Sequence, residues 1–160
     1  MTLNLQKITK DSRVAFDSKV NTIKKNRVLK KFSSLLKKNK QKIIKENYKD
    51  IKFAKKKKLK ENLIKRLEID EKKINNIIKS INQIIRIKDP TNRILEKWKR
   101  PNGLILKKVT VPIGVIAVIY ESRPNVTSDI ASLCFKSGNA VILRGGSEAF
   151  NTNKIISNLF

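Results

Sequence analysis

Histidine is absent from the 160 residues of this chain, and cysteine occurs only once, at position 134. Without histidine, the chain can form neither a histidine-ligated metal site nor a Ser-His-Asp triad from its own residues. A single cysteine permits no internal disulfide, which is typical of proteins in a reducing cytoplasm. No apolar run approaches the roughly 20 residues that cross a bilayer, and residues 1–11 are too polar for a signal peptide. We therefore expect a cytoplasmic protein with no bound metal and no membrane segment.

Acidic residues are scarce: 13 stand against 38 lysines and arginines, which gives a net charge of +25. Of the basic residues, 32 lie within positions 1–100. Such a charge suits a basic nucleic-acid-binding module, and that class stays open. The lysines, however, fall on the polar faces of amphipathic helices, and the run from Lys55 to Lys58 has no interleaved aromatic residues for base stacking. We expect a solvated basic surface and no specific nucleic-acid partner.

Most of the first hundred residues carry the apolar spacing of helices. One apolar face runs through positions 28–44, and further helices are predicted at about 47–57 and within 59–67. Asp70 is placed to cap a longer helix that ends before Asp89-Pro90. This helix carries a stripe of six isoleucines at positions 74, 77, 78, 81, 84 and 85.

The period changes after the turn signal Asn102-Gly103. Positions 104–111 favour a partly exposed strand, and the apolar run 114–120 favours a strand buried on both faces. A helix at about 126–137, capped by Thr127 and ended by Gly138, precedes a second short strand at 140–143. We therefore predict an α/β protein with a helical region at 1–102 and a parallel β-α-β unit within 103–160.

Two polar loops follow the carboxyl ends of these parallel strands, at Glu121–Asn125 and Arg144–Glu148, and should face one crevice. In the second loop, Gly145 and Gly146 permit close approach of a ligand, Arg144 can bind phosphate, and Ser147-Glu148 opens a helix whose amino end favours anions. The sequence matches no standard phosphate-binding fingerprint. A simple glycine turn with Ser147 as an N-cap remains an equal alternative.

Asn125 and Cys134 are the residues of this segment that could take part in chemistry. An asparagine amide can stabilise a developing oxyanion, although the local sequence by itself favours a capping or turn role for Asn125. Cys134 falls on the apolar face of the predicted helix with no base near it in sequence. We interpret Cys134 as a core residue.

The stretch VPIGVIAVIYESRPNVTSDIASLCFKSGNAVILRGGSEAFNTN, at 111–153, resembles the gamma-glutamyl phosphate reductase family, a branch of the aldehyde dehydrogenase superfamily. IYESRPNVT and GNAVILRGGSE are its specific motifs, and KNRVLKKFSSLL and KDPTNRI extend the resemblance upstream. The resemblance implies a Rossmann-like parallel sheet of the aldehyde dehydrogenase fold, preceded by the helical region and truncated here.

It also implies NADPH-dependent reduction of L-glutamyl 5-phosphate to the semialdehyde, in proline biosynthesis, by a homo-oligomer. In that family a cysteine thiolate displaces phosphate to give a thioester, which hydride then reduces. Asn125 matches the oxyanion asparagine, and Glu121, Ser122 and Arg123 belong to the substrate loop. The Arg144–Glu148 segment matches the loop beside the adenosine ribose, where Arg144 suits a 2′-phosphate.

The resemblance does not extend to the family's nucleophilic cysteine, and Cys134 does not match its surroundings. We expect the chain to be the N-terminal part of such a reductase, inactive alone. A subunit that completes a split reductase is the remaining alternative.

Overall fold

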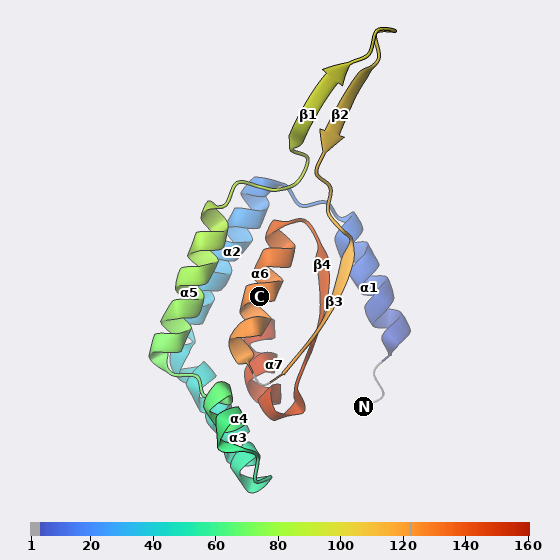
Figure 1. The fold of residues 1–160 in the computed structure, drawn as a ribbon. Coiled ribbons are helices and arrows are strands. Elements are labelled where there is room, and N and C mark those ends of the chain that lie inside the picture. The colour runs from blue at the N-terminus through green and yellow to red at the C-terminus, as the bar shows by residue number, and fades with distance from the viewer. Residues whose placement is uncertain (1–3, 122) are drawn as a thin grey trace.

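The computed structural model describes residues 4–121 and 123–160, in which helices enclose a short parallel sheet and a hairpin projects from one end (Figure 1). The elements, in chain order, are α1 (Leu5–Asp17), α2 (Thr22–Lys38), α3 (Lys40–Lys56), α4 (Glu61–Leu67), α5 (Glu71–Arg86), β1 (Ile94–Lys99), β2 (Ile105–Val109), β3 (Val115–Tyr120), α6 (Pro124–Lys136), β4 (Ala140–Gly145), a 3-10 turn (Ser147–Ala149) and α7 (Phe150–Leu159). The predicted α/β architecture is confirmed. No described helix is long and apolar enough to cross a membrane.

The helix expected to begin near residue 47 begins at Lys40, because the apolar face at 28–44 is divided between two helices. The division falls at Asn39, whose side-chain Nδ2 donates to the Leu35 carbonyl at 2.8 Å. The Asn39 backbone N–H bonds to the same carbonyl. Asn39 thus satisfies a carbonyl at the end of α2 and allows α3 to leave at an angle.

The isoleucine stripe of α5 forms the centre of the core. Asp70 caps the helix as predicted, since its Oδ1 accepts from the backbone N–H of Lys73 at 2.6 Å. The cluster joins α2, α3, α5 and α7 and contains Leu29, Phe32, Leu36, Ile43, Ile69, Ile74, Ile77, Ile81, Ile84, Ile155 and Ile156. Residues from both sides of position 102 therefore share one core.

The projecting hairpin pairs β1 with β2 in antiparallel register, from Ile94 opposite Val109 to Lys99 opposite Ile105. The sequence predicted β2 but not β1. Every residue of β1 is exposed, so no buried face produced the alternation that marks a strand. The hairpin spans the boundary at 102, and the division of the chain there stays a prediction.

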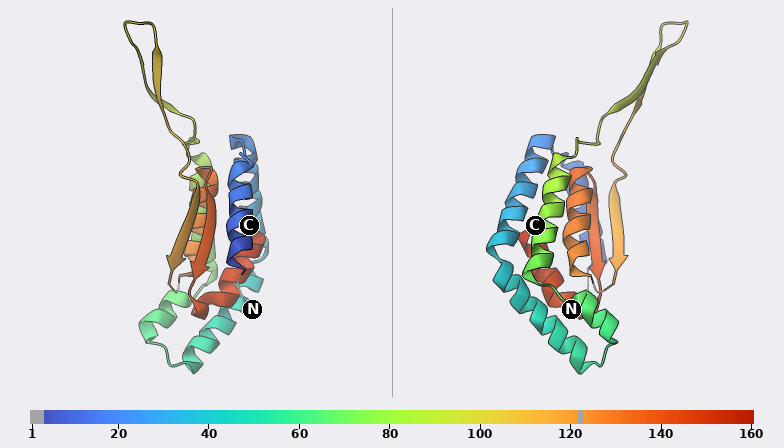
Figure 2. Two further views of the ribbon diagram at one scale, coloured as in Figure 1. Left: turned by 90° about the vertical axis from the view of Figure 1, so that its right-hand side faces the viewer. Right: turned by 60° about the vertical axis from the view of Figure 1, so that its left-hand side comes forward.

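Strands β3 and β4 are parallel, as predicted, and α6 connects them. Gly138 ends the crossover helix with φ +74°, the left-handed conformation expected of it. Burial of β3 on both faces was a wrong prediction, because Ile119 is 85% exposed. Helix α6 packs on one face of the β3–β4 sheet, and α1 lies beside β4. The outer face of β3 near its carboxyl end is therefore left uncovered (Figure 2).

Helix α6 begins at Pro124, two residues before the predicted start. Proline is favoured at a helix start, where its missing N–H costs no hydrogen bond. Thr127 is consequently inside the first turn and does not cap the helix. Its hydroxyl instead contacts Tyr120 Oη at 2.6 Å and donates to Asn153 Oδ1 at 2.9 Å.

Candidate functional site

The two predicted loops begin at the same edge of the parallel sheet. The register places Tyr120, the last residue of β3, opposite Gly145, the last residue of β4. The contacts through Thr127 join the end of β3 to α6 and α7, so three elements hold this edge together. Among the predicted loop residues, Ser122 lies outside the described residues.

Close packing surrounds Gly145 more firmly than Gly146. A Cβ on Gly145 would collide with the Asn153 side-chain amide and lie 3.0 Å from the Tyr120 ring, and one on Gly146 would collide with the Glu148 carboxylate. Neither glycine has a positive φ, so at Gly145 space rather than backbone conformation disfavours a side chain, whereas at Gly146 the flexible Glu148 side chain could move aside. The loop therefore presents bare backbone beside the Glu148 carboxylate.

Ser147 does not cap the following helix, so the predicted N-cap interpretation was wrong. Its side chain forms no capping hydrogen bond and is exposed. The start of α7 is satisfied from α3 instead, because Asp50 Oδ2 accepts from the Thr152 N–H at 2.8 Å and Oδ1 from the Asn151 N–H at 3.1 Å. The Ser147 hydroxyl is therefore not engaged in capping.

Arg144 lies in β4 rather than in the loop. It is paired in register with Ile119, on the face opposite the Tyr120 side chain that contacts α6. Both residues are exposed, and no ion pair within 4–121 and 123–160 includes Arg144. The guanidinium is thus a free cation beside the loop that contains Gly145 and Gly146, the glycine loop.

Asn125 occupies the first turn of α6 and is exposed. Its side-chain Nδ2 donates to Asp129 Oδ2 at 3.2 Å, one turn further along the helix, and makes no capping bond. An amide nitrogen carries two N–H groups, so a second donor remains for a ligand. Burial raises the pKa of Asp129, and the hydrogen bond from Asn125 partly opposes that rise.

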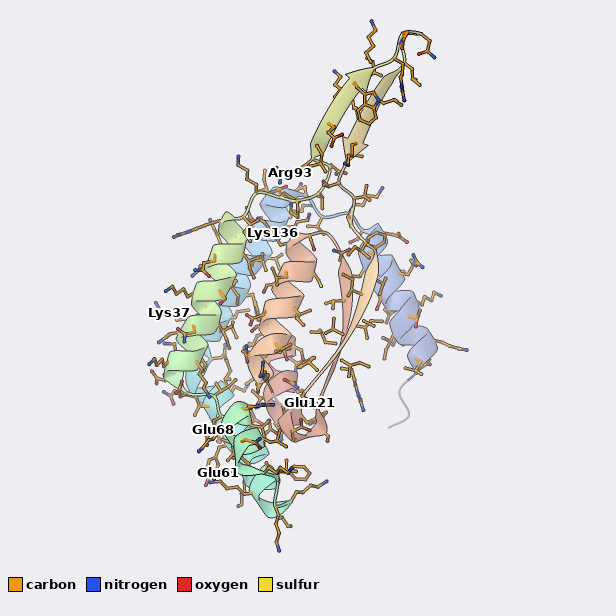
Figure 3. The ribbon with its side chains drawn as sticks, viewed as in Figure 1. Lys37, Glu61, Glu68, Arg93, Glu121 and Lys136 are labelled. Carbon is orange, nitrogen blue, oxygen red and sulfur yellow. The ribbon has the colours of Figure 1, made fainter. Side chains whose placement is uncertain are left out.

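A hollow of about 300 Å³ lies at the start of α6 and is lined by Arg66, Tyr120, Glu121, Arg123 and Val126, but not by Asn125. Figure 3 shows Glu121 below the end of β3, on the side of the molecule where α4 lies. Arg66 comes from α4 and was missed by the sequence analysis, because nothing in its local pattern separates it from other basic helix residues. The fold thus adds a cation to the predicted substrate loop.

Cys134 is 7% exposed and packs inside, as interpreted from the sequence. Burial raises the pKa of its thiol, which disfavours the thiolate that nucleophilic attack needs. The described residues contain no cluster of three or more histidine, cysteine, aspartate or glutamate side chains that could hold a metal ion.

A larger cavity of about 980 Å³ lies between α1, α2, α6 and the beginning of β4. Lys25 Nζ is 3.0 Å from Asp89 Oδ2 in its wall. Burial raises the pKa of Asp89, but hydrogen bonds from Thr22, Thr91 and Lys25 outweigh it and hold that pKa well below its usual range. This cavity adjoins the amino end of β4, away from the edge where ligands bind such sheets.

Comparisons with known proteins find relatives over most of this chain. No protein-family model matches the chain. A gamma-glutamyl phosphate reductase from a Hydrogenobaculum species is 54% identical over 143 residues, covering 89% of this chain and 32% of that protein. The chain spans about a third of the length of the curated relatives it matches.

Solved structures agree with this assignment. The crystal structure of gamma-glutamyl phosphate reductase from Thermotoga maritima superposes with a TM-score of 0.90 at 40% identity, covering 94% of this chain and 37% of that one. A probable aldehyde dehydrogenase from Listeria monocytogenes has the same fold, with a TM-score of 0.65 at 15% identity over 96% of this chain and 32% of its own. These matches favour a reductase over a nucleic-acid-binding module. Over 89% of its own length, and about a third of theirs, the chain is therefore homologous to the gamma-glutamyl phosphate reductases.

Proposed function

We propose that this chain forms part of an enzyme that reduces L-glutamyl 5-phosphate to L-glutamate 5-semialdehyde with NADPH in proline biosynthesis. The observation that carries the proposal is the 54% identity to a named reductase over 89% of the chain. The arrangement of Asn125 and the glycine loop at one edge of the sheet supports it.

Asn125 donates its free amide N–H to the oxygen of the reacting carbonyl as negative charge develops there. Such a donor contributes about 10²- to 10³-fold to turnover. Asp129 orients the amide through the 3.2 Å bond to Oδ2. Because Cys134 is buried with a raised pKa, the thiol that attacks the substrate belongs to another cysteine, which we place outside these 160 residues.

The polar groups of the glycine loop and of Arg144 are suited to a dinucleotide. Arg144 offers a free guanidinium for a phosphate, Ser147 an exposed hydroxyl, and Glu148 a carboxylate that can accept from ribose hydroxyls. The bare backbone of Gly145 and Gly146 lets such a ligand approach closely. When bound, NADPH supplies the hydride.

We also propose that the enzyme is cytoplasmic and forms a homo-oligomer. Support for assembly comes from the hairpin, where Leu95, Trp98 and Ile105 are each at least 41% exposed. Apolar side chains gathered on a projecting element favour burial against a partner.

The test is the reverse reaction of the purified, complete gene product with L-glutamate 5-semialdehyde, phosphate and NADP⁺. We expect NADPH formation, followed by its absorbance, that depends on phosphate. Asn125→Ala should lower kcat by about 10²-fold or more, with Lys65→Gln as an exposed control. The 160 residues alone should show no turnover. Absence of phosphate-dependent NADPH formation would refute the proposal.

A further inference from the structure

The hollow at the start of α6 gathers charges of both signs from separate parts of the chain. Arg66 comes from α4, Glu121 follows β3, and Arg123 immediately precedes α6. Within the described part of the chain, none of the three takes part in an ion pair. Two cations and an anion therefore line one small space without neutralising one another.

Two guanidinium groups at one hollow repel each other unless an anion lies between them. A carboxylate is suited to that place, because the planar fork of arginine donates two parallel hydrogen bonds to its oxygens. The amino end of the 13-residue helix α6 also lies there, with Val126 lining the hollow, and its unpaired N–H groups add to the positive potential.

Glu121 determines which anion fits. A phosphate would bring two negative charges close to this carboxylate, which opposes binding. The head group of an α-amino acid carries a carboxylate for the arginines and an ammonium for Glu121. A hollow of about 300 Å³ has room for a small amino acid but not for a dinucleotide.

We propose that Arg66 and Arg123 bind the α-carboxylate of the substrate and that Glu121 binds its α-ammonium group. This inference rests on the proposed function, since it takes the substrate to be an activated L-glutamate. Asn125 stands between Pro124 and Val126, so the residues for the head group and for the reacting carbonyl would be neighbours. Arg66 would then select the substrate without contacting the reacting atoms.

The direct test is calorimetric titration of the complete protein with L-glutamate, with glutarate, which lacks the ammonium group, and with inorganic phosphate. We expect L-glutamate to bind more tightly than glutarate, and Glu121→Gln to remove that preference. Arg66→Gln should weaken L-glutamate binding about tenfold or more. Arg66→Lys should restore part of it, because it keeps the charge but loses the fork. Lys65→Gln, an exposed change on the same helix, is the control.

Unchanged L-glutamate affinity in folded Arg66→Gln would overturn the inference. So would phosphate binding that depends on Arg66 and is not displaced by L-glutamate. In the reductase assay, Arg66→Gln should raise the KM for the semialdehyde and leave the KM for NADP⁺ unchanged. If wild-type protein binds L-glutamate through Arg66 but forms no NADPH, the proposed function fails and the amino-acid site stands.

Discussion

We expect replacement of Asp50 with alanine to lower the free energy of unfolding more than the loss of any surface charge. Asp50 is 2% exposed on α3, and its carboxylate accepts from the backbone N–H groups of Asn151 and Thr152, from the Thr152 hydroxyl at 2.6 Å and from the Asn151 amide at 2.8 Å. These bonds join segments 101 and 102 residues apart. They also supply the missing cap of α7.

The size of this loss in stability follows from the hydrogen-bond donors that Asp50→Ala would leave without an acceptor. Thr152 is fully buried, so its N–H and hydroxyl would lose Asp50 with no water to replace it. A buried donor left without a partner costs about 1–3 kcal/mol, and more where the lost acceptor was charged. We expect Asp50→Ala to lower the free energy of unfolding by about 3–5 kcal/mol, a large part of the 5–15 kcal/mol typical of a domain.

Urea unfolding followed by far-ultraviolet circular dichroism measures this loss. Glu61→Ala is the matched control, because Glu61 pairs with Lys65 on the surface, where such a pair contributes about 0–1 kcal/mol. Asp50→Asn should fall between the two, since it keeps one acceptor oxygen. A loss below about 1 kcal/mol for Asp50→Ala would refute the capping role and the energetic argument together.

Three further outcomes can be measured on the same chain. Gly145→Ala should weaken NADPH binding and lower stability by about 1–3 kcal/mol, through overpacking against Asn153; Asn153→Ala added to it should recover part of the loss, and full stability of the single variant would contradict the packing. The lowered pKa of Asp89 means that its ionised form stabilises the fold above the unfolded-state pKa of 3.8 and that this stabilisation is lost as pH falls below it. The difference in unfolding free energy between wild type and Asp89→Asn should therefore be constant near neutral pH and shrink in acid, and a difference that grows in acid would reverse the sign of the argument. The Cys134 thiol should react slowly with a thiol reagent in the folded chain and rapidly in urea, so fast reaction without denaturant would show that it is accessible.

Much of the fold could be predicted from local signals in the sequence. The cap at Asp70, the isoleucine stripe of α5 and the positive φ at Gly138 each arise from neighbours within one helix or turn, so the sequence displays them directly. The β-α-β unit followed because two short apolar runs separated by a helix allow few other arrangements. Its parallel order then placed Asn125 and Gly145 at one edge.

Contacts between distant residues could not be predicted in this way. Asp50 on α3 reads as an ordinary polar helix residue until α7 is placed against it, and Arg66 becomes a candidate ligand only because α4 lies beside the end of β3. The first strand of the hairpin was missed for the opposite reason. Its six residues are all exposed, so no buried face left a pattern in the sequence.

The hairpin and the isoleucine core should also differ in the free energy that local opening requires. Its amides bond only within a two-stranded ribbon, and no residue of either strand is fully buried. Such a ribbon is at best marginally stable in water, so its local opening needs little free energy while the isoleucine core stays closed. In hydrogen exchange, the amides of β1 and β2 should therefore exchange early and together, and those of α2 and α5 only when the whole chain unfolds.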